Sequence, residues 1–333
     1  MIKKLFTLFT LSALLSAATG CSSSDDEPVK QRQPVVLKGE IFAIGSDVAT
    51  VWSGGQTVGV YMVKKGTNEV VDNYANKKHF ADNRGVTGYL VPADNVPMYL
   101  PDDGTEVDYR VYYPYDPDVK SDLNASTKTY HEKAYTEVRV GEKTKPDGFL
   151  YARNAKSNKE EKVVTFQMKS MLSVVNLQIE CPKEIKQLTA TIKSTATMAI
   201  FDLMEGKFVK RVVEEEKPIP MEGTKESTTE SSTFTMQAVI LSGEVEQEAA
   251  IEITTTNEQN ETTTYNALPL NQTIEVNEAD NQAEENTQYN VSAQITEGSS
   301  EITTEVTSKS SIVILKWVED EEDPVGGVAR PDK

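Results

Sequence analysis

Hydrophobic and polar residues alternate along most of the chain, which is the pattern of β-strands with one buried face. Valine, threonine, isoleucine and tyrosine dominate these runs, as a pleated and half-buried surface favours. In the segment Val107–Tyr113, the alternation predicts that Asp108, Arg110 and Tyr112 face outward. The clearest strands are predicted at Val58–Met62, Val107–Tyr113, Met171–Ile179, Phe234–Ile240 and Tyr289–Ile295.

Turn residues separate the predicted strands. Asp103-Gly104 favours a tight turn, and Gly206 predicts another reversal. The polar segment Met221–Ser232 is expected to form an exposed loop. No segment after residue 20 has a sustained helical stripe, so many short strands indicate sandwiches or partly closed barrels. A parallel α/β architecture is excluded.

A change of composition predicts a domain boundary. The polar and charged segment Asn154–Lys162 separates a Tyr- and Gly-rich half from a Thr- and Glu-rich half. A chain of 333 residues is also long enough for two domains. We therefore predict an all-β protein with two tandem β-sandwich domains, residues 35–162 and residues 163–333, the second ending in an acidic tail.

The N-terminus has the features of a secretory signal. Lys3 and Lys4 precede the apolar run Leu5–Leu15, and small residues follow it. The run is too short to span a bilayer. Cys21 directly after these residues resembles the lipobox of bacterial lipoproteins, in which that cysteine carries the acyl chains, such as palmitate. We predict a signal peptide at residues 1–20 and lipidation at Cys21, with an ordinary secreted protein as the alternative.

The segment after Cys21 is polar and acidic. Residues 21–34 cannot bury apolar surface, so we expect a flexible tether. Ser22–Pro28 also resembles the surface-export signal of Bacteroidota lipoproteins, and the alternative is a plain solvated linker. The resemblance implies an outer-membrane lipoprotein displayed at the cell surface.

Charge and cysteine content narrow the possible partners. The net charge of −18 argues against a nucleic-acid partner, which needs clustered lysine and arginine. With Cys21 lipidated, Cys181 has no partner in the chain for an intramolecular disulfide. Its apolar surroundings in the sequence predict a buried structural thiol.

Trp52–Tyr61 contains a tryptophan, a glycine turn and an apolar strand ending in tyrosine, and Tyr112–Tyr115 reads Tyr-Tyr-Pro-Tyr. In this order the two segments resemble the "IGVY" strand and the "YYPY" element of the fimbrillin family, the type V pilins of Bacteroidota. Phe166–Val175 is similar to the opening of the second domain, although Met168 stands where histidine is common. Ile312–Trp317 is similar to the closing strand. The motif residues expected in the core are Trp52, Tyr61, Tyr113, Pro114, Phe166 and Trp317.

The resemblance implies transthyretin-like, Greek-key sandwiches and a fimbrial subunit or adhesin. It implies export as a lipoprotein precursor and assembly by donor-strand exchange, in which a protease releases the first strand, here Val35–Ile44. The implied partners are other fimbrial subunits, the outer membrane through the lipid anchor, a trypsin-like protease, and ligands on host or bacterial surfaces. Arg32 precedes the strand and would not open a groove. The candidate cleavage residues are Lys38, Lys64, Lys65 and Arg84.

The C-terminal segment leaves the position in a fimbria open. Ile312–Trp317 could pair within its own chain or be donated to a neighbouring subunit, and residues 318–324 are too acidic to fill an apolar groove. The sequence therefore does not distinguish a stalk subunit from a tip or anchor subunit, or from a lipoprotein that never polymerises.

Nothing in the sequence indicates an enzyme or a cofactor. His79 and His131 belong to no metal or triad motif, and there is no nucleophile elbow, P-loop or dinucleotide fingerprint. The three acids Asp116, Asp118 and Asp122 could bind calcium, but a solvated loop is the favoured interpretation.

The main alternative function is a cell-surface glycan-binding lipoprotein, because such proteins also bind sugars on exposed aromatic side chains. Its candidate platform is Tyr112, Tyr115, Tyr130 and Tyr135.

Overall fold

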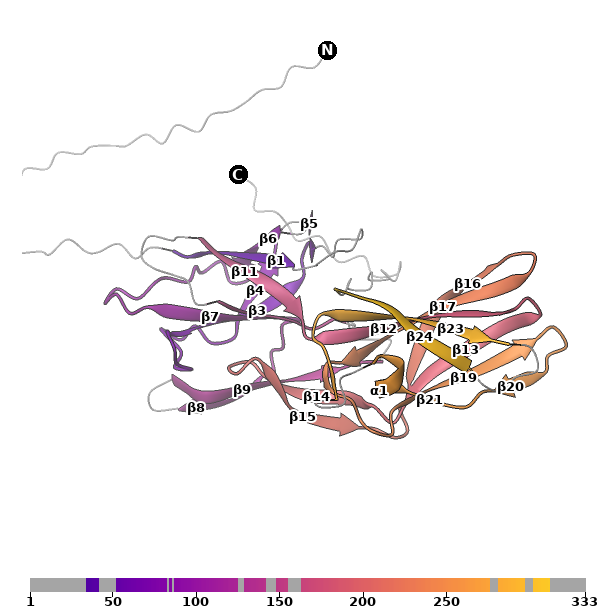
Figure 1. The fold of residues 1–333 in the computed structure, drawn as a ribbon. Helices are drawn as coiled ribbons and strands as arrows, with labels where there is room; N and C mark the ends of the chain where they lie inside the picture. Colours follow the sequence, from indigo (N-terminus) through magenta and orange to yellow (C-terminus); the bar gives the residue numbers. More distant parts are fainter. Residues whose placement is uncertain are drawn as a thin grey trace, which may run out of the picture. The chain divides into compact units, whose positions relative to one another are not determined.

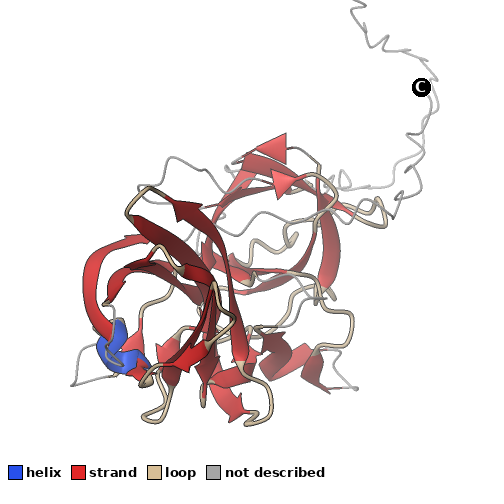
Figure 2. Ribbon diagram, turned by 90° about the vertical axis from the view of Figure 1, so that its right-hand side faces the viewer, coloured by secondary structure: helices blue, strands red, loops and turns tan. Residues whose placement is uncertain are grey.

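The computed structural model describes residues 34–41, 52–82, 84–85, 87–124, 129–141, 148–154, 163–275, 281–296 and 302–311. Within these residues the chain forms strands β1 to β24 and one short helix, α1 (Leu270–Thr273). Figure 2 shows how completely strands dominate, with α1 in blue. The predicted all-β fold class is confirmed. Across the described residues, no helix has the length and apolarity needed to cross a membrane.

The N-terminal strands form a closed barrel, where the sequence predicted a sandwich. Its order is β1-β11-β10-β7-β3-β4-β6. Strand β1 pairs with β11 in parallel, and the other neighbours in the barrel are antiparallel. Figure 1 shows β11 beside β1 although many residues separate them in the chain. The barrel strands are β1 (Val36–Ile41), β3 (Thr57–Lys64), β4 (Lys77–Ala81), β6 (Thr87–Pro92), β7 (Val107–Tyr113), β10 (Leu150–Asn154) and β11 (Val163–Ser170).

A nine-stranded sheet follows the barrel. Its order is β20-β19-β13-β16-β17-β12-β23-β24, and β21 pairs with β19. Met171 alone separates β11 from β12, so the barrel runs directly into the centre of this sheet. Its strands are β12 (Leu172–Pro182), β13 (Ile185–Lys193), β16 (Ile219–Ser227), β17 (Ser231–Leu241), β19 (Ala250–Asn257), β20 (Thr262–Thr264), β21 (Leu268–Pro269), β23 (Thr287–Ile295) and β24 (Ile302–Ser311).

A third sheet joins strands from both halves of the sequence. Strands β8 (Lys120–Asn124) and β9 (Thr129–Arg139) pair with β14 (Ala196–Asp202) and β15 (Lys207–Val213) in the order β15-β14-β9-β8. Gly206, with a φ of 73°, forms the turn predicted between two strands. The domain boundary near residue 162 stays a prediction. Two short ribbons complete the described strands: β2 (Trp52–Ser53) with β5 (Arg84–Gly85), and β18 (Gly243–Glu244) with β22 (Gln282–Ala283).

Strand β16 folds the nine-stranded sheet over on itself. Its first residues, Ile219–Met221, pair with β13, whereas Glu222–Ser227 pair with β17. Strands that switch partners in this way form the corners of sandwiches. Gly223 lies just after the switch, and a Cβ there would stand 1.9 Å from the carbonyl oxygen of Thr235. The corner therefore requires glycine.

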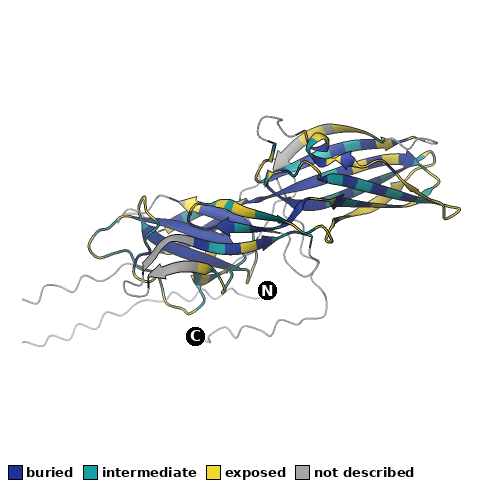
Figure 3. Cartoon of the chain, turned by 90° about the horizontal axis from the view of Figure 1, so that it is seen from below, coloured by how far each residue is buried: buried dark blue, intermediate teal, exposed yellow. Residues whose placement is uncertain are grey.

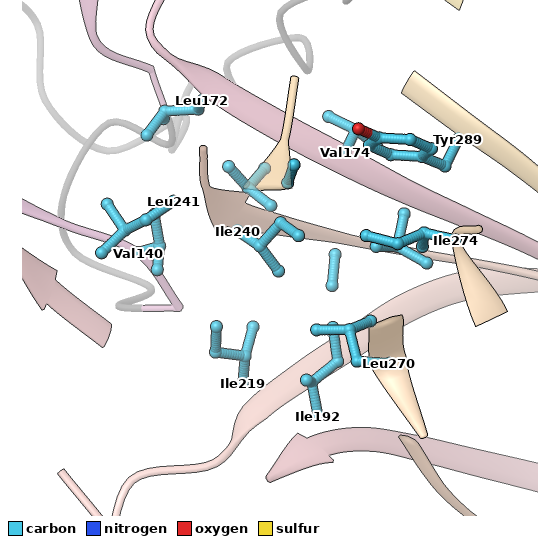
Figure 4. Packing of buried hydrophobic residues seen from close by; sticks show 14 of the residues in the cluster. Val140, Leu172, Val174, Ile192, Ile219, Ile240, Leu241, Leu270, Ile274 and Tyr289 are labelled. Atoms are coloured by element: carbon cyan, nitrogen blue, oxygen red, sulfur yellow. The ribbon is translucent and has the colours of Figure 1, made fainter. Parts of the chain in front are cut away.

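The buried side chains form two clusters. One fills the barrel, and the other lies between the layers of the folded sheet and extends to the β14–β9 sheet. Figure 3 shows buried residues alternating with intermediate or exposed ones along many of the strands. In Figure 4, Ile192 and Ile219 lie on one side of the larger core, and Val174 and Tyr289 lie on the other.

The predicted outward face of Val107–Tyr113 is wrong. All residues of β7 are buried, Asp108, Arg110 and Tyr112 included. The reason is that the outer face of β7 packs against the larger core. Arg110 Nε donates to the carbonyl oxygen of Met204 at 3.3 Å, and the ring of Tyr112 lies 6.5 Å from that of Phe149.

The loop predicted at Met221–Ser232 is also a strand pair. Residues Ile219–Ser227 and Ser231–Leu241 form the hairpin β16–β17, whose tip is exposed. Because residues 222–230 are exposed throughout, their sequence has no apolar alternation to mark them as strand.

Candidate functional site

Strand β1 closes the barrel and is the centre of the candidate site. It pairs with β11 on one side, where Gly39 is opposite Phe166, and with β6 on the other, where Gly39 is opposite Gly88. Alternate residues of β1 point inward, and Leu37, Gly39 and Ile41 are buried. The predicted first strand is therefore present at Val36–Ile41, and residues 42–44 lie outside the described residues.

The slot that holds β1 is lined with apolar side chains. Val164, Phe166 and Met168 on β11 and Leu90 on β6 are all buried in the barrel cluster. The ring of Phe166 meets that of Tyr109 edge to face at 5.8 Å. Each inward side chain of β1 therefore fills part of a continuous apolar core.

Trp52 fixes the position of β1 in the slot. Its indole is fully buried, and Nε1 donates to the carbonyl oxygen of Gly39 at 2.9 Å. The ring packs on the facing pair Gly39 and Gly88, and meets Tyr113 edge to face at 6.2 Å. Sequence reasoning missed both glycines, although a glycine inside a strand often marks a close approach of another group.

Without β1, the barrel would be an incomplete sheet. The edges of β11 and β6 would expose unpaired N–H and C=O groups beside the apolar slot. Such an edge recruits another extended segment, with main-chain bonds giving affinity and alternate side chains giving register. The chemistry of this site is therefore the binding of a β-strand.

The other predicted motif residues are distributed around the barrel. Tyr61 on β3 and Tyr113 on β7 are buried, and Pro114 follows β7 directly. Cys21 and Trp317 lie outside the described residues.

The candidate cleavage residues occupy three different places. Lys38 lies within β1, with its Nζ 5.6 Å from the centre of the Tyr89 ring. Lys64 ends β3 and Lys65 follows it in a turn, where they pair with Glu69 and Glu106. Arg84 lies in β5. Because residues 42–51 contain neither lysine nor arginine, a trypsin-like protease has no target residue between β1 and Trp52.

The aromatic side chains considered for sugar binding do not form a platform among the described residues. Tyr112 is fully buried, and its hydroxyl donates to the Asn76 side chain at 2.7 Å. Tyr115 and Tyr135 are half-buried, and the side chain of Tyr130 lies outside the described residues.

Of the three acids considered for calcium binding, Asp116 receives hydrogen bonds from Asp118 N and from the hydroxyl of Thr136.

His79 on β4 is buried, which predicts that the stability of the barrel depends on pH. Burial lowers the pKa of His79 below its usual 6.5, although the Lys77 carbonyl and Asp94 oppose the shift. The unfolded chain therefore takes up a proton that the folded chain does not. We expect the free energy of unfolding to fall as the pH drops below about 6.5. Urea unfolding of His79→Gln should show a weaker pH dependence, and an unchanged dependence would contradict this role.

Comparison with known proteins shows which family and fold the chain shares. The model of the fimbrillin-like family matches residues 46–317. A crystal structure of a proposed cell adhesion protein from Bacteroides uniformis has a TM-score of 0.60 at 18% identity, covering 84% of this chain and 98% of that one. A second, from Bacteroides ovatus, has a TM-score of 0.61 at 17% identity, covering 86% of this chain and 100% of that one. At these identities the likeness shows a shared fold. No curated protein matches the chain.

The chain belongs to the fimbrillin-like family, because the family model covers most of its length. The resemblance inferred from the motifs is thereby confirmed. Membership indicates a fimbrial protein of the cell surface, with other fimbrial subunits as its partners.

Proposed function

We propose that this chain is a fimbrial subunit that joins its neighbours by exchanging β1 for a strand of another subunit. The observation that carries the proposal is the position of β1. It is the first described strand, it closes the barrel between β11 and β6, and it buries alternate residues in an apolar slot. Release of β1 exposes two strand edges and the apolar slot at once.

The proposal includes export as a lipoprotein. Cys21 would carry the acyl chains and hold the precursor on the outer face of the outer membrane, from which processed subunits enter the fimbria. The support is the signal-like N-terminus and the acidic segment after it. Metabolic labelling with palmitate should mark the wild-type chain and leave Cys21→Ala unlabelled. Equal labelling of both would exclude Cys21.

A trypsin-like protease is proposed to trigger the exchange, with Lys38, Lys64, Lys65 and Arg84 as its candidate targets. Of these, Lys38 alone lies in β1, so cleavage there requires β1 to leave its neighbours first. Cuts after the other three would also release further strands. The proposal involves no enzymatic activity of the chain and no cofactor.

Native digestion tests the exchange. The purified precursor is treated with trypsin, the cut is mapped by mass spectrometry, and assembly is followed as ladders on SDS gels without boiling. We expect loss of β1 to precede the ladders. Clean removal of β1 without assembly under any condition would contradict the proposal.

A locked variant provides the matched control. Val36 on β1 and Val163 on β11 are register partners, and both side chains are exposed. Neighbouring strand positions lie within the Cα distance that a disulfide needs. The double variant Val36→Cys, Val163→Cys should hold β1 in place and prevent assembly, and a reductant should restore it. Equal assembly of the oxidised and reduced forms would show that β1 does not have to leave.

A further inference from the structure

We propose that the slot is selective for strands with glycine at the position of Gly39, so that its partner is an extended segment reading apolar-x-Gly-x-apolar. The inference rests on the strand exchange proposed above and deepens it by defining the sequence of the incoming strand. It comes from the contact between Trp52 and two glycines, which the motif analysis did not use.

The contact leaves little space for a side chain, because the indole would have to shift to admit even a Cβ. A Cβ on Gly39 would stand 3.0 Å from Cζ2 of Trp52, and a Cβ on Gly88 would stand 3.0 Å from Cδ1 of the same ring. Gly39 and Gly88 are direct partners in the β1–β6 ladder. The indole therefore occupies the volume that two side chains would fill on ordinary facing strands.

Trp52 cannot easily move aside. Its ring is fully buried, and it is held by the Tyr113 ring. Its N–H bonds the Gly39 carbonyl oxygen, a group that any incoming residue would also offer. The backbone contact is therefore the same for all strands, and the discrimination comes from the missing Cβ.

The neighbouring inward positions require the opposite property. Leu37 and Ile41, two residues on either side of Gly39, are buried in the barrel cluster. Polar side chains there would lose water without gaining partners. Two apolar residues with a glycine midway between them therefore define both the composition and the register of the incoming strand.

This rule excludes the C-terminal apolar segment of a second copy. Residues 312–317 contain no glycine. Whichever of residues 314–317 took the Gly39 position, a large side chain (Ile314, Leu315, Lys316 or Trp317) would meet the indole. The slot therefore takes its strand from elsewhere than Ile312–Trp317 of an identical chain.

Peptide exchange tests the rule directly. A site for a specific protease is inserted between Gly45 and Ser46 of the full chain, which is folded and then cut. Fluorescent peptides of residues 34–44 compete for the slot, and anisotropy reports binding. We expect Gly39→Ala to bind about tenfold and Gly39→Val about a hundredfold more weakly than the native peptide. The control Glu40→Ala changes a position that is not fully buried and should stay within about threefold of the native peptide.

The direction of the alanine effect is diagnostic. Glycine inside a strand is less favourable than alanine. If nothing blocked the Gly39 position, Gly39→Ala would therefore tighten binding of the peptide. Equal affinity of the native and Gly39→Val peptides, or equally tight binding by a peptide of residues 311–318, would overturn the rule while leaving strand exchange intact. Failure of every peptide, the native one included, would instead overturn the exchange itself.

Two further variants keep the inference testable if β1 leaves too slowly for exchange. In the uncut chain, Gly39→Val should loosen β1 and speed tryptic cleavage at Lys38, whereas Glu40→Ala should not. Changing Trp52→Leu should relieve the contact, so that the Gly39→Val peptide binds at least as well as the native one. An unchanged cleavage rate in Gly39→Val, or an undiminished preference for glycine in Trp52→Leu, would contradict a role for this contact.

Discussion

Replacing Trp52 with alanine is expected to lower the free energy of unfolding by about 3–5 kcal/mol, the cost of deleting a large buried aromatic side chain. The indole fills the space beside the paired Gly39 and Gly88, so its loss leaves a cavity that these two residues have no side chains to fill. The edge-to-face contact with Tyr113 and the bond to the Gly39 carbonyl oxygen disappear as well.

Urea unfolding followed by circular dichroism measures this loss, since the variant lacks one of the two tryptophans that fluorescence would report. The control is Val96→Ala, because Val96 is 59% exposed. A surface change of this kind should stay within about 0.5 kcal/mol. Similar losses in the two variants would show that Trp52 has no special place in the barrel.

Replacing Gly223 with alanine is expected to cost about 3 kcal/mol, at the upper end of the range for overpacking. The added Cβ would meet the Thr235 carbonyl oxygen at 1.9 Å and Met236 Sδ at 2.7 Å. The first of these atoms belongs to the backbone of β17, so a side-chain rotation cannot relieve the clash. The strand must move at the point where β16 changes partners.

Thr224→Ala is the matched control, since Thr224 is the next residue of β16 and is exposed. Its loss in urea unfolding should be within about 0.5 kcal/mol. A Gly223→Ala chain as stable as Thr224→Ala would mean that the corner can open without cost.

The sequence revealed the strands whose faces differ in polarity. Phe234–Ile240 and Tyr289–Ile295 alternate clearly and are found in β17 and β23. Alternation fails where both faces share one environment. Arg110 and Tyr112 of β7 are buried because a second core covers the outer face, and a single sequence does not show what packs on a strand from outside.

The sequence predicted one part of the candidate site, the first strand, but not the strands that flank it. The first strand at Val35–Ile44 was evident from its apolar residues and its position after the tether. The partners of that strand were not, because β11 follows it by more than a hundred residues and pairs with it in parallel. The role of Gly39 on β1 depends on Trp52, which lies outside the barrel strands in the β2–β5 ribbon, so neither residue alone indicates the contact.

The direct passage of β11 into β12 has a mechanical consequence for a fibre. Strand β1 lies parallel to β11, and Met171 is the sole residue between β11 and β12. Strand β12 is in turn bonded to β17 from Leu172 to Pro182 and to β23 from Ser173 to Glu180. If another strand replaced β1 in the same direction, tension along it would load many backbone hydrogen bonds in shear at once, whereas a perpendicular pull would break them one at a time.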